Sequence, residues 1–253
     1  MTRPSADRRH RQAGAASSPR RQLLRFDRAE RSAHWANALL FTILMLTALP
    51  LYFPGVEAVV GRRALVAEIH TWAGIVLPVP LIVAMSGRWG AGLRRDIRRF
   101  NLWTHDEIRW LVSLGRRATP RFDKFNPGQK LNAVFTAGAI VVMLATGLVL
   151  KWVRVFPLQW RTGATFVHDV LAAAIFVVVV GHVAFALTHR DALRAIVKGW
   201  VSEAWAARHA EAWLEEERAS APAAASGTAA APHGAEAAAA AEAARSGPAV
   251  PRC

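Results

Sequence analysis

The chain has 253 residues, and 53% of them are hydrophobic, yet its formal net charge is +14 at pH 7. Soluble domains seldom combine these two properties, so the apolar and the basic residues must occupy different segments. The basic residues flank apolar runs instead of alternating with aromatic residues along one face, which is typical of membrane topology and argues against nucleic acid as a partner.

In chain order, a basic segment at residues 1–26 precedes four apolar runs, at residues 36–53, 64–86, 133–150 and 165–187. Each run has about the 17 to 25 residues that a helix needs to cross the hydrocarbon of a bilayer. The sequence therefore predicts an all-α membrane protein in which residues 27–190 form a bundle of four transmembrane helices.

An even number of spans places both termini on the same side of the membrane. Of the Lys and Arg residues, 27 lie in the terminal segments and the long middle loop, and 5 lie in the two loops on the other side. Because basic residues are enriched in cytoplasmic loops, both termini and the middle loop are predicted to be cytoplasmic. The expected location is a bacterial inner membrane, which the chain crosses several times.

Two further segments follow the last span. Residues 191–218 mix tryptophan and aliphatic residues with Arg, Lys and Glu, a pattern that predicts an amphipathic helix at the cytoplasmic interface. Residues 219–253 are rich in alanine and interrupted by proline and glycine. They hold too few bulky apolar residues to build a core, so this tail is predicted to be disordered.

Four of the nine histidines fall inside or at the edges of the apolar runs: His34, His70, His168 and His182. A polar ring in hydrocarbon needs a partner, which for a single histidine is as often a neighbouring carbonyl or hydroxyl as a metal. On one helix, His168 and His182 are separated by about 21 Å along the axis but only about 40° around it. These two histidines therefore share one face at two depths.

The other two histidines match those depths. A capping box of Asp27 and Glu30 is predicted to start the first helix, which puts His34 about 10 Å from the cytoplasmic end, level with the later histidine of the fourth span. His70 lies about 12 Å from the periplasmic end of the second span, level with the earlier histidine of the fourth.

Two histidine pairs at two depths can supply the axial ligands of two stacked b-type haems, with His34 opposite His182 and His70 opposite His168. Two imidazoles fill the axial positions of the iron, which favours electron transfer over oxygen chemistry. The only cysteine is Cys253, so both haems would be bound noncovalently. The other five histidines are predicted to be solvated, and His189, beyond the fourth span, is the rival ligand among them.

Four stretches resemble the gamma subunit of respiratory formate dehydrogenase, a membrane cytochrome b. They are RFDRAERSAHWANALLF, AEIHTWAG, KFNPGQK and the two histidines of the fourth span, and the resemblance covers residues 24–217. The resemblance implies the same two pairs, with the haem of His34 and His182 on the cytoplasmic side and the other haem on the periplasmic side. It also implies a menaquinone or ubiquinone beside Asn126 and Gly128.

The residues around Asn126 can also be interpreted without the resemblance. An amide and exposed backbone N–H groups at the mouth of the third span can hydrogen-bond a quinone carbonyl at the membrane surface. The alternative is that Asn-Pro-Gly is only a turn that caps the third helix.

The resemblance implies a quinone-reducing complex that oxidises formate on the periplasmic side and passes the electrons through this subunit. The chain itself lacks the cysteines that iron–sulfur clusters need and has no evident molybdopterin site. An iron–sulfur beta subunit and a molybdenum- or tungsten-dependent catalytic alpha subunit are therefore implied as partners. Two alternatives stay open: a cytochrome b of a hydrogenase, thiosulfate reductase or b561-type system, and a membrane scaffold or transporter whose histidines relay protons or bind metal.

Overall fold

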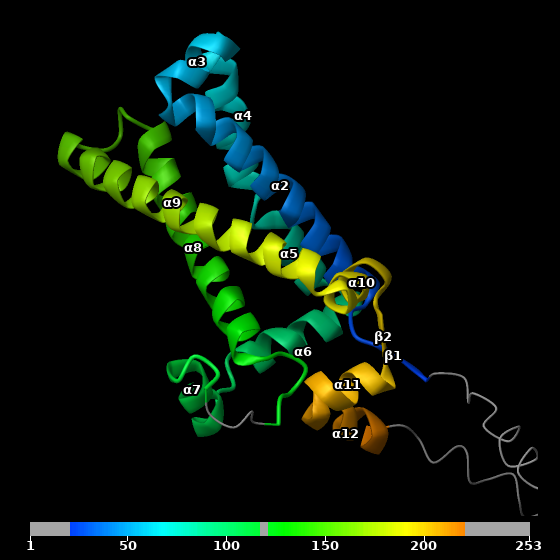
Figure 1. The fold of residues 1–253 in the computed structure, drawn as a ribbon. Coiled ribbons are helices and arrows are strands. Elements are labelled where there is room, and N and C mark those ends of the chain that lie inside the picture. The colour runs from blue at the N-terminus through cyan, green and yellow to red at the C-terminus, as the bar shows by residue number, and fades with distance from the viewer. Residues whose placement is uncertain (1–20, 117–120, 221–253) are drawn as a thin grey trace, which may run out of the picture. The chain divides into compact units, whose positions relative to one another are not determined.

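The computed structural model describes residues 21–116 and 121–220, and within them almost every element is a helix (Figure 1). Residues 1–20 of the predicted basic segment and residues 221–253 of the predicted tail lie outside the described residues. Among the described residues, four helical stretches are long and apolar enough to cross a membrane. The predicted all-α membrane fold is confirmed.

The spanning helices cover the four predicted apolar runs. They are α2 (Arg28–Tyr52), the consecutive pair α4 (Arg63–Val76) and α5 (Val79–Ser86), α8 (Pro127–Lys151) and α9 (Leu158–Thr188). Polar residues at most of the helix ends extend them past the apolar runs, because a helix continues until a cap or a proline stops it.

The second span is divided between two helices at Leu77 and Pro78. Proline has no backbone N–H and its ring crowds the preceding turn, so Pro78 and Pro80 interrupt the hydrogen-bond ladder of a continuous helix. The ladder ends as Leu77 N–H donates to Ala73 O at 3.0 Å, and it resumes as Ile82 N–H donates to Pro78 O at 3.1 Å. The predicted run of residues 64–86 is thus two consecutive helices.

The first spanning helix starts where the sequence predicted. Asp27 is its N-cap, and its carboxylate accepts a hydrogen bond from Glu30 N–H at 2.8 Å, while the Glu30 carboxylate accepts one from Asp27 N–H at 2.6 Å. This capping box satisfies N–H groups that have no partner inside the helix. It fixes the depth of His34, the seventh residue of α2.

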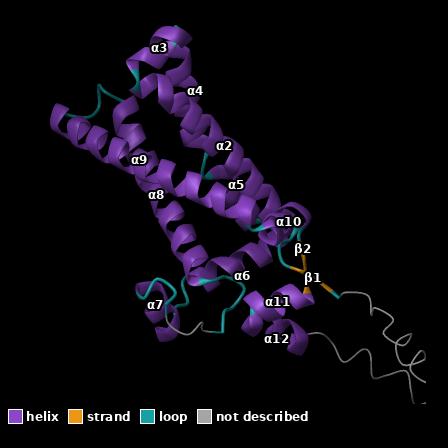
Figure 2. Cartoon of the chain, viewed as in Figure 1, coloured by secondary structure: helices purple, strands orange, loops and turns teal. Residues whose placement is uncertain are grey.

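The loops between the spans are themselves folded (Figure 2). The middle loop contains η1 (Arg88–Gly90), α6 (Ala91–Phe100) and α7 (His105–Val112). At the other end of the bundle, α3 (Pro54–Val60) connects α2 to α4. The prediction treated both segments only as loops between the spans.

Buried charges attach the middle loop to the spanning helices. Lys124 Nζ donates to Asp96 Oδ2 at 2.5 Å and lies 3.5 Å from Glu30 Oε1, and all three side chains are buried. Just beyond it along the chain, buried Lys130 Nζ donates to Glu107 Oε1 at 2.7 Å. Charges withdrawn from water need partners of opposite sign, so these pairs hold α6 and α7 against α2 and the start of α8.

Residues 191–218 do not form the single amphipathic helix that the sequence predicted. They are divided among α10 (Arg190–Lys198), β2 (Trp200–Ser202), α11 (Glu203–His209) and α12 (Glu211–Ser220), and β2 pairs antiparallel with β1 (Gln22–Leu24). The break occurs at Gly199, whose φ is +91° and where a Cβ would lie 2.7 Å from Phe26 O. Only glycine tolerates this left-handed turn against a neighbouring backbone.

Two of the three tryptophans of this segment, Trp205 and Trp213, pack inward, whereas Trp200 is 45% exposed. Trp213 is 1% exposed, and it shares a core with Trp205, Ala195, Val201, Ala206, Ala210 and Leu214. Buried Arg25 lies over the Trp205 ring, 4.4 Å from its centre. Burial lowers the pKa of Arg25 to about 10, so its guanidinium stays charged at neutral pH.

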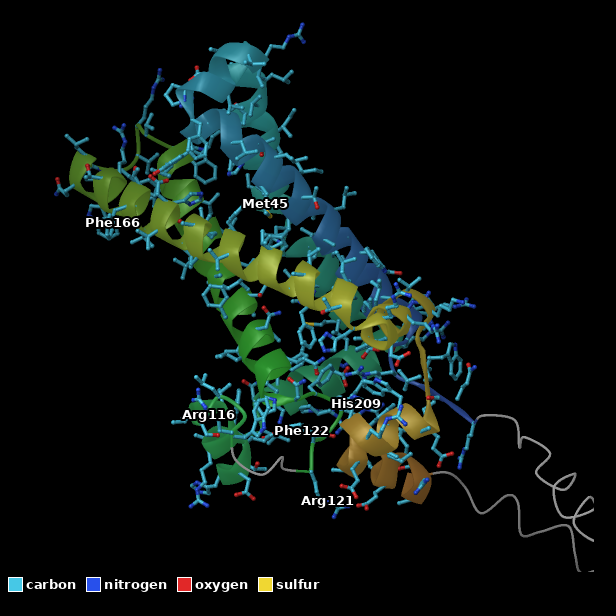
Figure 3. All side chains as sticks on the ribbon, viewed as in Figure 1. Met45, Arg116, Arg121, Phe122, Phe166 and His209 are labelled. Carbon is cyan, nitrogen blue, oxygen red and sulfur yellow. The ribbon has the colours of Figure 1, made fainter. Side chains whose placement is uncertain are left out.

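The chain that leads into α8 contacts the helices that contribute to this core. Figure 3 labels Arg121 and Phe122 beside α11 and α12. Arg121 pairs with Glu211 at 3.2 Å, and Phe122 O accepts a hydrogen bond from Ala212 N–H at 3.1 Å. The chain divides into two units after Leu214, and the second is described only as far as Ser220.

Candidate functional site

The four histidines of the apolar spans form two facing pairs. The His34 ring on α2 lies 6.2 Å from the His182 ring on α9, centre to centre, with an interplanar angle of 56°. The His70 ring on α4 lies 6.5 Å from the His168 ring on α9, with an angle of 61°. The structure therefore brings together the residues that the depth argument paired.

The distance within each pair distinguishes between two kinds of contact. A direct hydrogen bond between two imidazoles brings their ring centres to about 5 Å. Two imidazoles on opposite sides of one metal ion, each bonded at about 2 Å, have their centres about 6.4 Å apart. Both observed separations leave room for the second arrangement, although they also lie within the range of ordinary edge contacts between rings, and no hydrogen bond joins the rings of either pair within the described residues.

The donor set of each pair decides what kind of metal centre it suits. Among residues 21–116 and 121–220, no group of three or more His, Cys, Asp or Glu side chains could hold a bare metal ion. Two opposed imidazoles suit an iron whose other ligands come from a porphyrin. The residues present therefore fit a b-type haem between the members of a pair.

The packing of the helices agrees with this fit. The helix α9 packs along α8, and α2 packs along α4 and α5. In contrast, the backbone of α9 scarcely approaches α2 or α4, although the histidine rings face one another across that separation. Helices that hold a macrocycle between them need such a separation.

Two threonines contact the histidines of one pair, and sequence reasoning missed them. Thr47 Oγ1 lies 2.8 Å from His70 Nδ1, and Thr146 Oγ1 lies 2.9 Å from His168 Nδ1. Each contact joins two helices, α2 with α4 and α8 with α9. Threonine is common in membrane helices as a hydrogen-bonding residue, so no sequence signal separated these two from the others.

The remaining described histidines lie apart from the pairs. His189 is exposed and stacks on Phe185, with the ring centres 3.8 Å apart, and His209 is exposed and stacks on Trp205 at 4.9 Å. His105 is the exposed first residue of α7. Two more, His10 and His233, lie outside the described residues. The rival ligand His189 therefore faces no other histidine ring among the described residues.

The predicted quinone residues lie at the start of α8. Asn126 is the N-cap: its Oδ1 accepts a hydrogen bond from Gln129 N–H at 2.9 Å, and Gln129 Oε1 accepts one from Asn126 N–H at 3.1 Å. The capping interpretation is therefore confirmed for the amide oxygen. The amide nitrogen of Asn126 donates to no described residue, and Gly128 beside it is exposed.

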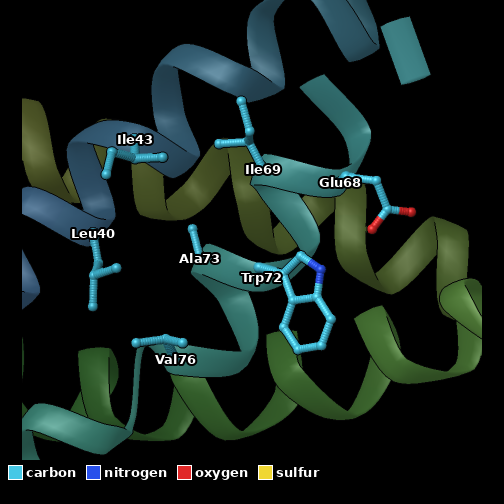
Figure 4. A pocket seen from close by; sticks show the side chains of 7 residues that line it. All are labelled: Leu40, Ile43, Glu68, Ile69, Trp72, Ala73 and Val76. Atoms are coloured by element: carbon cyan, nitrogen blue, oxygen red, sulfur yellow. The ribbon is translucent and has the colours of Figure 1, made fainter. Parts of the chain in front are cut away.

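An apolar depression of about 430 Å³ lies between α2 and α4 and contains none of the four histidines. Figure 4 shows Leu40 and Ile43 on one side of it and Trp72 and Ala73 on the other. Its apolar lining, interrupted by Glu68, is the type of surface that a membrane helix presents to lipid. It takes no part in the arrangement of the histidine pairs.

Comparison with known proteins gives results that agree with this geometry. Residues 25–199 match the family described as prokaryotic cytochrome b561. The cytochrome b556(fdo) subunit of formate dehydrogenase from Escherichia coli is 26% identical over 78% of this chain and 93% of its own length. The cytochrome b556 subunit of formate dehydrogenase from Haemophilus influenzae is 26% identical, with coverages of 78% and 84%. The nitrate-inducible cytochrome b556(Fdn) subunit from Escherichia coli is 22% identical, with coverages of 81% and 96%.

Proposed function

The chain belongs to the prokaryotic cytochrome b561 family, and from its similarity to cytochrome b556 subunits we propose that it is the membrane subunit of a formate dehydrogenase complex. At the coarser level it is a multi-pass membrane cytochrome b of electron transport. In the proposed complex, electrons from formate oxidation on the periplasmic side reach a quinone near the cytoplasmic side. The names of the relatives support formate as the donor.

One observation carries the proposal: α9 presents a histidine to α2 at one depth and a histidine to α4 at another. His34 and His182 would hold one b-type haem noncovalently, and His70 and His168 would hold a second. A haem with two histidine ligands exchanges single electrons and offers no open position to oxygen. The helices of this chain would orient the two histidine ligands of each haem. They would also keep the path of the electrons across the membrane within the protein.

The orientation of the subunit follows from the charges of its loops. The side rich in Lys and Arg includes the middle loop and the start of α8, and it is assigned to the cytoplasm of a bacterium with an inner membrane. His34 is close to the start of α2 and His182 is in the last turns of α9, so this pair lies toward the cytoplasm. His70 and His168 lie toward the periplasm.

The proposal requires partner subunits, because formate oxidation needs groups that this chain does not provide. The single cysteine, Cys253, cannot ligate an iron–sulfur cluster on its own. An iron–sulfur subunit and a molybdenum- or tungsten-dependent catalytic subunit would supply the electrons at the periplasmic side. This division leaves the present subunit with quinone reduction as its share of the reaction.

The start of α8 is the proposed site for menaquinone or ubiquinone. The free amide nitrogen of Asn126 and the exposed backbone of Gly128 can donate hydrogen bonds to a quinone carbonyl, while the amide oxygen of Asn126 continues to cap the helix. Protons for the reduced quinone would come from the cytoplasm, the side on which this helix begins.

Replacing Asn126 separates the proposed quinone contact from the cap. Asn126→Asp keeps the capping oxygen and removes the amide donor, so the KM for quinone should rise roughly five- to tenfold, as for one lost hydrogen bond, without a change in thermal stability. Asn126→Ala removes both and should also destabilise the protein by about 1 kcal/mol. Steady-state kinetics and thermal unfolding measure the two effects. An unchanged quinone KM in Asn126→Asp would remove this residue from the site.

The donor is tested on the complex purified from membranes with its natural subunits. Under anaerobic conditions, formate should reduce the b-type absorption bands and then added quinone, and hydrogen should reduce neither. Recovery of a nickel–iron enzyme with the chain, or reduction of the b-type bands by hydrogen alone, would show that the subunit receives its electrons from a different donor. It would still be a cytochrome b.

A further inference from the structure

The hydroxyl of Thr47 donates its hydrogen to its own helix. A threonine hydroxyl has one hydrogen to donate and lone pairs to accept. Thr47 Oγ1 lies 2.7 Å from Ile43 O and 3.1 Å from Leu44 O, and carbonyl oxygens can only accept. The hydroxyl therefore donates to the carbonyls of its own helix. Toward His70 Nδ1, at 2.8 Å, it can only accept, so this ring nitrogen carries the proton.

The same arrangement recurs at the other histidine of that pair. Thr146 Oγ1 lies 2.8 Å from Val142 O and 3.2 Å from Met143 O, so it too donates to carbonyls of its own helix. It consequently accepts from His168 Nδ1–H at 2.9 Å. In both rings the proton sits on Nδ1, which leaves Nε2 unprotonated and able to bind a metal.

Among the described residues, the pair formed by His34 and His182 lacks such hydrogen bonds to threonine. Within the described part of the chain, neither His34 nor His182 makes a side-chain hydrogen bond. The His34 ring instead contacts the edge of Trp35, with ring centres 5.5 Å apart. The two pairs therefore differ in the partners of their outer ring nitrogens, although their ring separations are nearly equal.

We propose that Thr47 and Thr146 are positioning residues that fix the tautomer of His70 and His168 and hold the iron between them at a lower reduction potential than the iron between His34 and His182. The proposal rests on the proposed function, because it presupposes haem in both layers. An imidazole that donates from Nδ1–H is a stronger electron donor through Nε2, which stabilises oxidised iron. The resulting order of potentials favours movement of electrons toward the cytoplasmic-side layer.

The test replaces each hydroxyl in the intact complex and follows both haems in a spectroscopic redox titration. Thr47→Val and Thr146→Val keep the shape of the side chain and remove the hydroxyl acceptor; in Thr47→Val the Leu44 carbonyl stays as a second partner of His70, so the effect should be smaller than in Thr146→Val. One of the two midpoint potentials should rise in each, by roughly the 59 mV that corresponds to a tenfold change in preference for a one-electron couple. Thr47→Ser and Thr146→Ser should restore it.

Thr42→Val is the matched control. Thr42 lies on the same helix as Thr47, and its hydroxyl also donates to its own helix, to Ala38 O at 2.8 Å, but within the described residues it forms no hydrogen bond with a histidine. Both potentials should stay at their wild-type values in this variant. If a valine variant loses one haem, retention of both in the serine variant and in Thr42→Val also supports the proposal, whereas loss in the serine variant contradicts it.

The result identifies which of the two proposals fails. Unchanged potentials in Thr47→Val and Thr146→Val, or equal shifts of both haems, would overturn the role of the threonines and leave the electron-transfer function standing. Absence of b-type haem from the wild-type protein would overturn the function and this inference together.

Discussion

Replacing His182 with alanine is expected to remove one haem and leave the other in place. Among the described histidines, His182 faces only His34, and the pair of His70 and His168 lies on α4 and the earlier turns of α9. Haem extracted per chain should fall by half, and formate-dependent quinone reduction should fall at least about a hundredfold, since a lost ligand costs more than the 10- to 100-fold of a lost supporting residue. Haem extraction and turnover of the purified complex measure these effects.

The pairing also predicts how variants with two histidines replaced should behave. His34→Ala should remove the same haem as His182→Ala, and the double variant should be no worse than either one, because each haem needs both ligands. His182→Ala combined with His168→Ala should remove both haems. His189→Ala is the control, since that exposed ring stacks on Phe185 away from both pairs. Loss of a haem from His189→Ala would refute the assignment.

The second large effect is expected from Lys124. Its ammonium group is buried between Asp96 and Glu30, so Lys124→Met leaves negative charge buried without its partner. Removal of one member of a buried ion pair costs about 3–5 kcal/mol. The free energy of unfolding of the detergent-solubilised protein should fall by that amount.

The ion pair of Lys151 with Glu68 provides the comparison. It has the same 2.5 Å separation as the Lys124–Asp96 pair, but its side chains are 35% and 54% exposed. Exposed pairs contribute about 0–1 kcal/mol, so Lys151→Met should have a small effect. Adding Asp96→Asn to Lys124→Met should recover part of the lost stability. Equal destabilisation by Lys124→Met and Lys151→Met would contradict the buried cluster.

The spans and the histidine depths could be predicted because simple lengths determine them. The bilayer sets how many apolar residues a span needs, and the fixed rise of a helix converts sequence position into depth. A cap at Asp27 then places His34 correctly, as the structure confirms for the start of α2. These two quantities place His34 and His182 at the same depth, the structure shows that their rings face each other, and their role as ligands stays a prediction.

The features that the sequence did not predict depend on contacts between residues far apart in the chain. A pattern of tryptophans among charged residues is the same whether the apolar face meets lipid or protein, so residues 191–218 gave no sign that Trp213 is buried. The turn at Gly199 arises from its approach to Phe26 O. Thr47 and Lys124 likewise acquire their roles from partners on other helices.

Each facing pair of histidines is proposed to bind one haem, so the decisive measurement is the amount of haem per chain. Haem extracted from the purified wild-type complex is converted to its pyridine derivative, quantified by absorbance and divided by the amount of this subunit. We expect two b-type haems per chain in the wild-type protein and one in His34→Ala. One haem in the wild-type protein, or none, would contradict it.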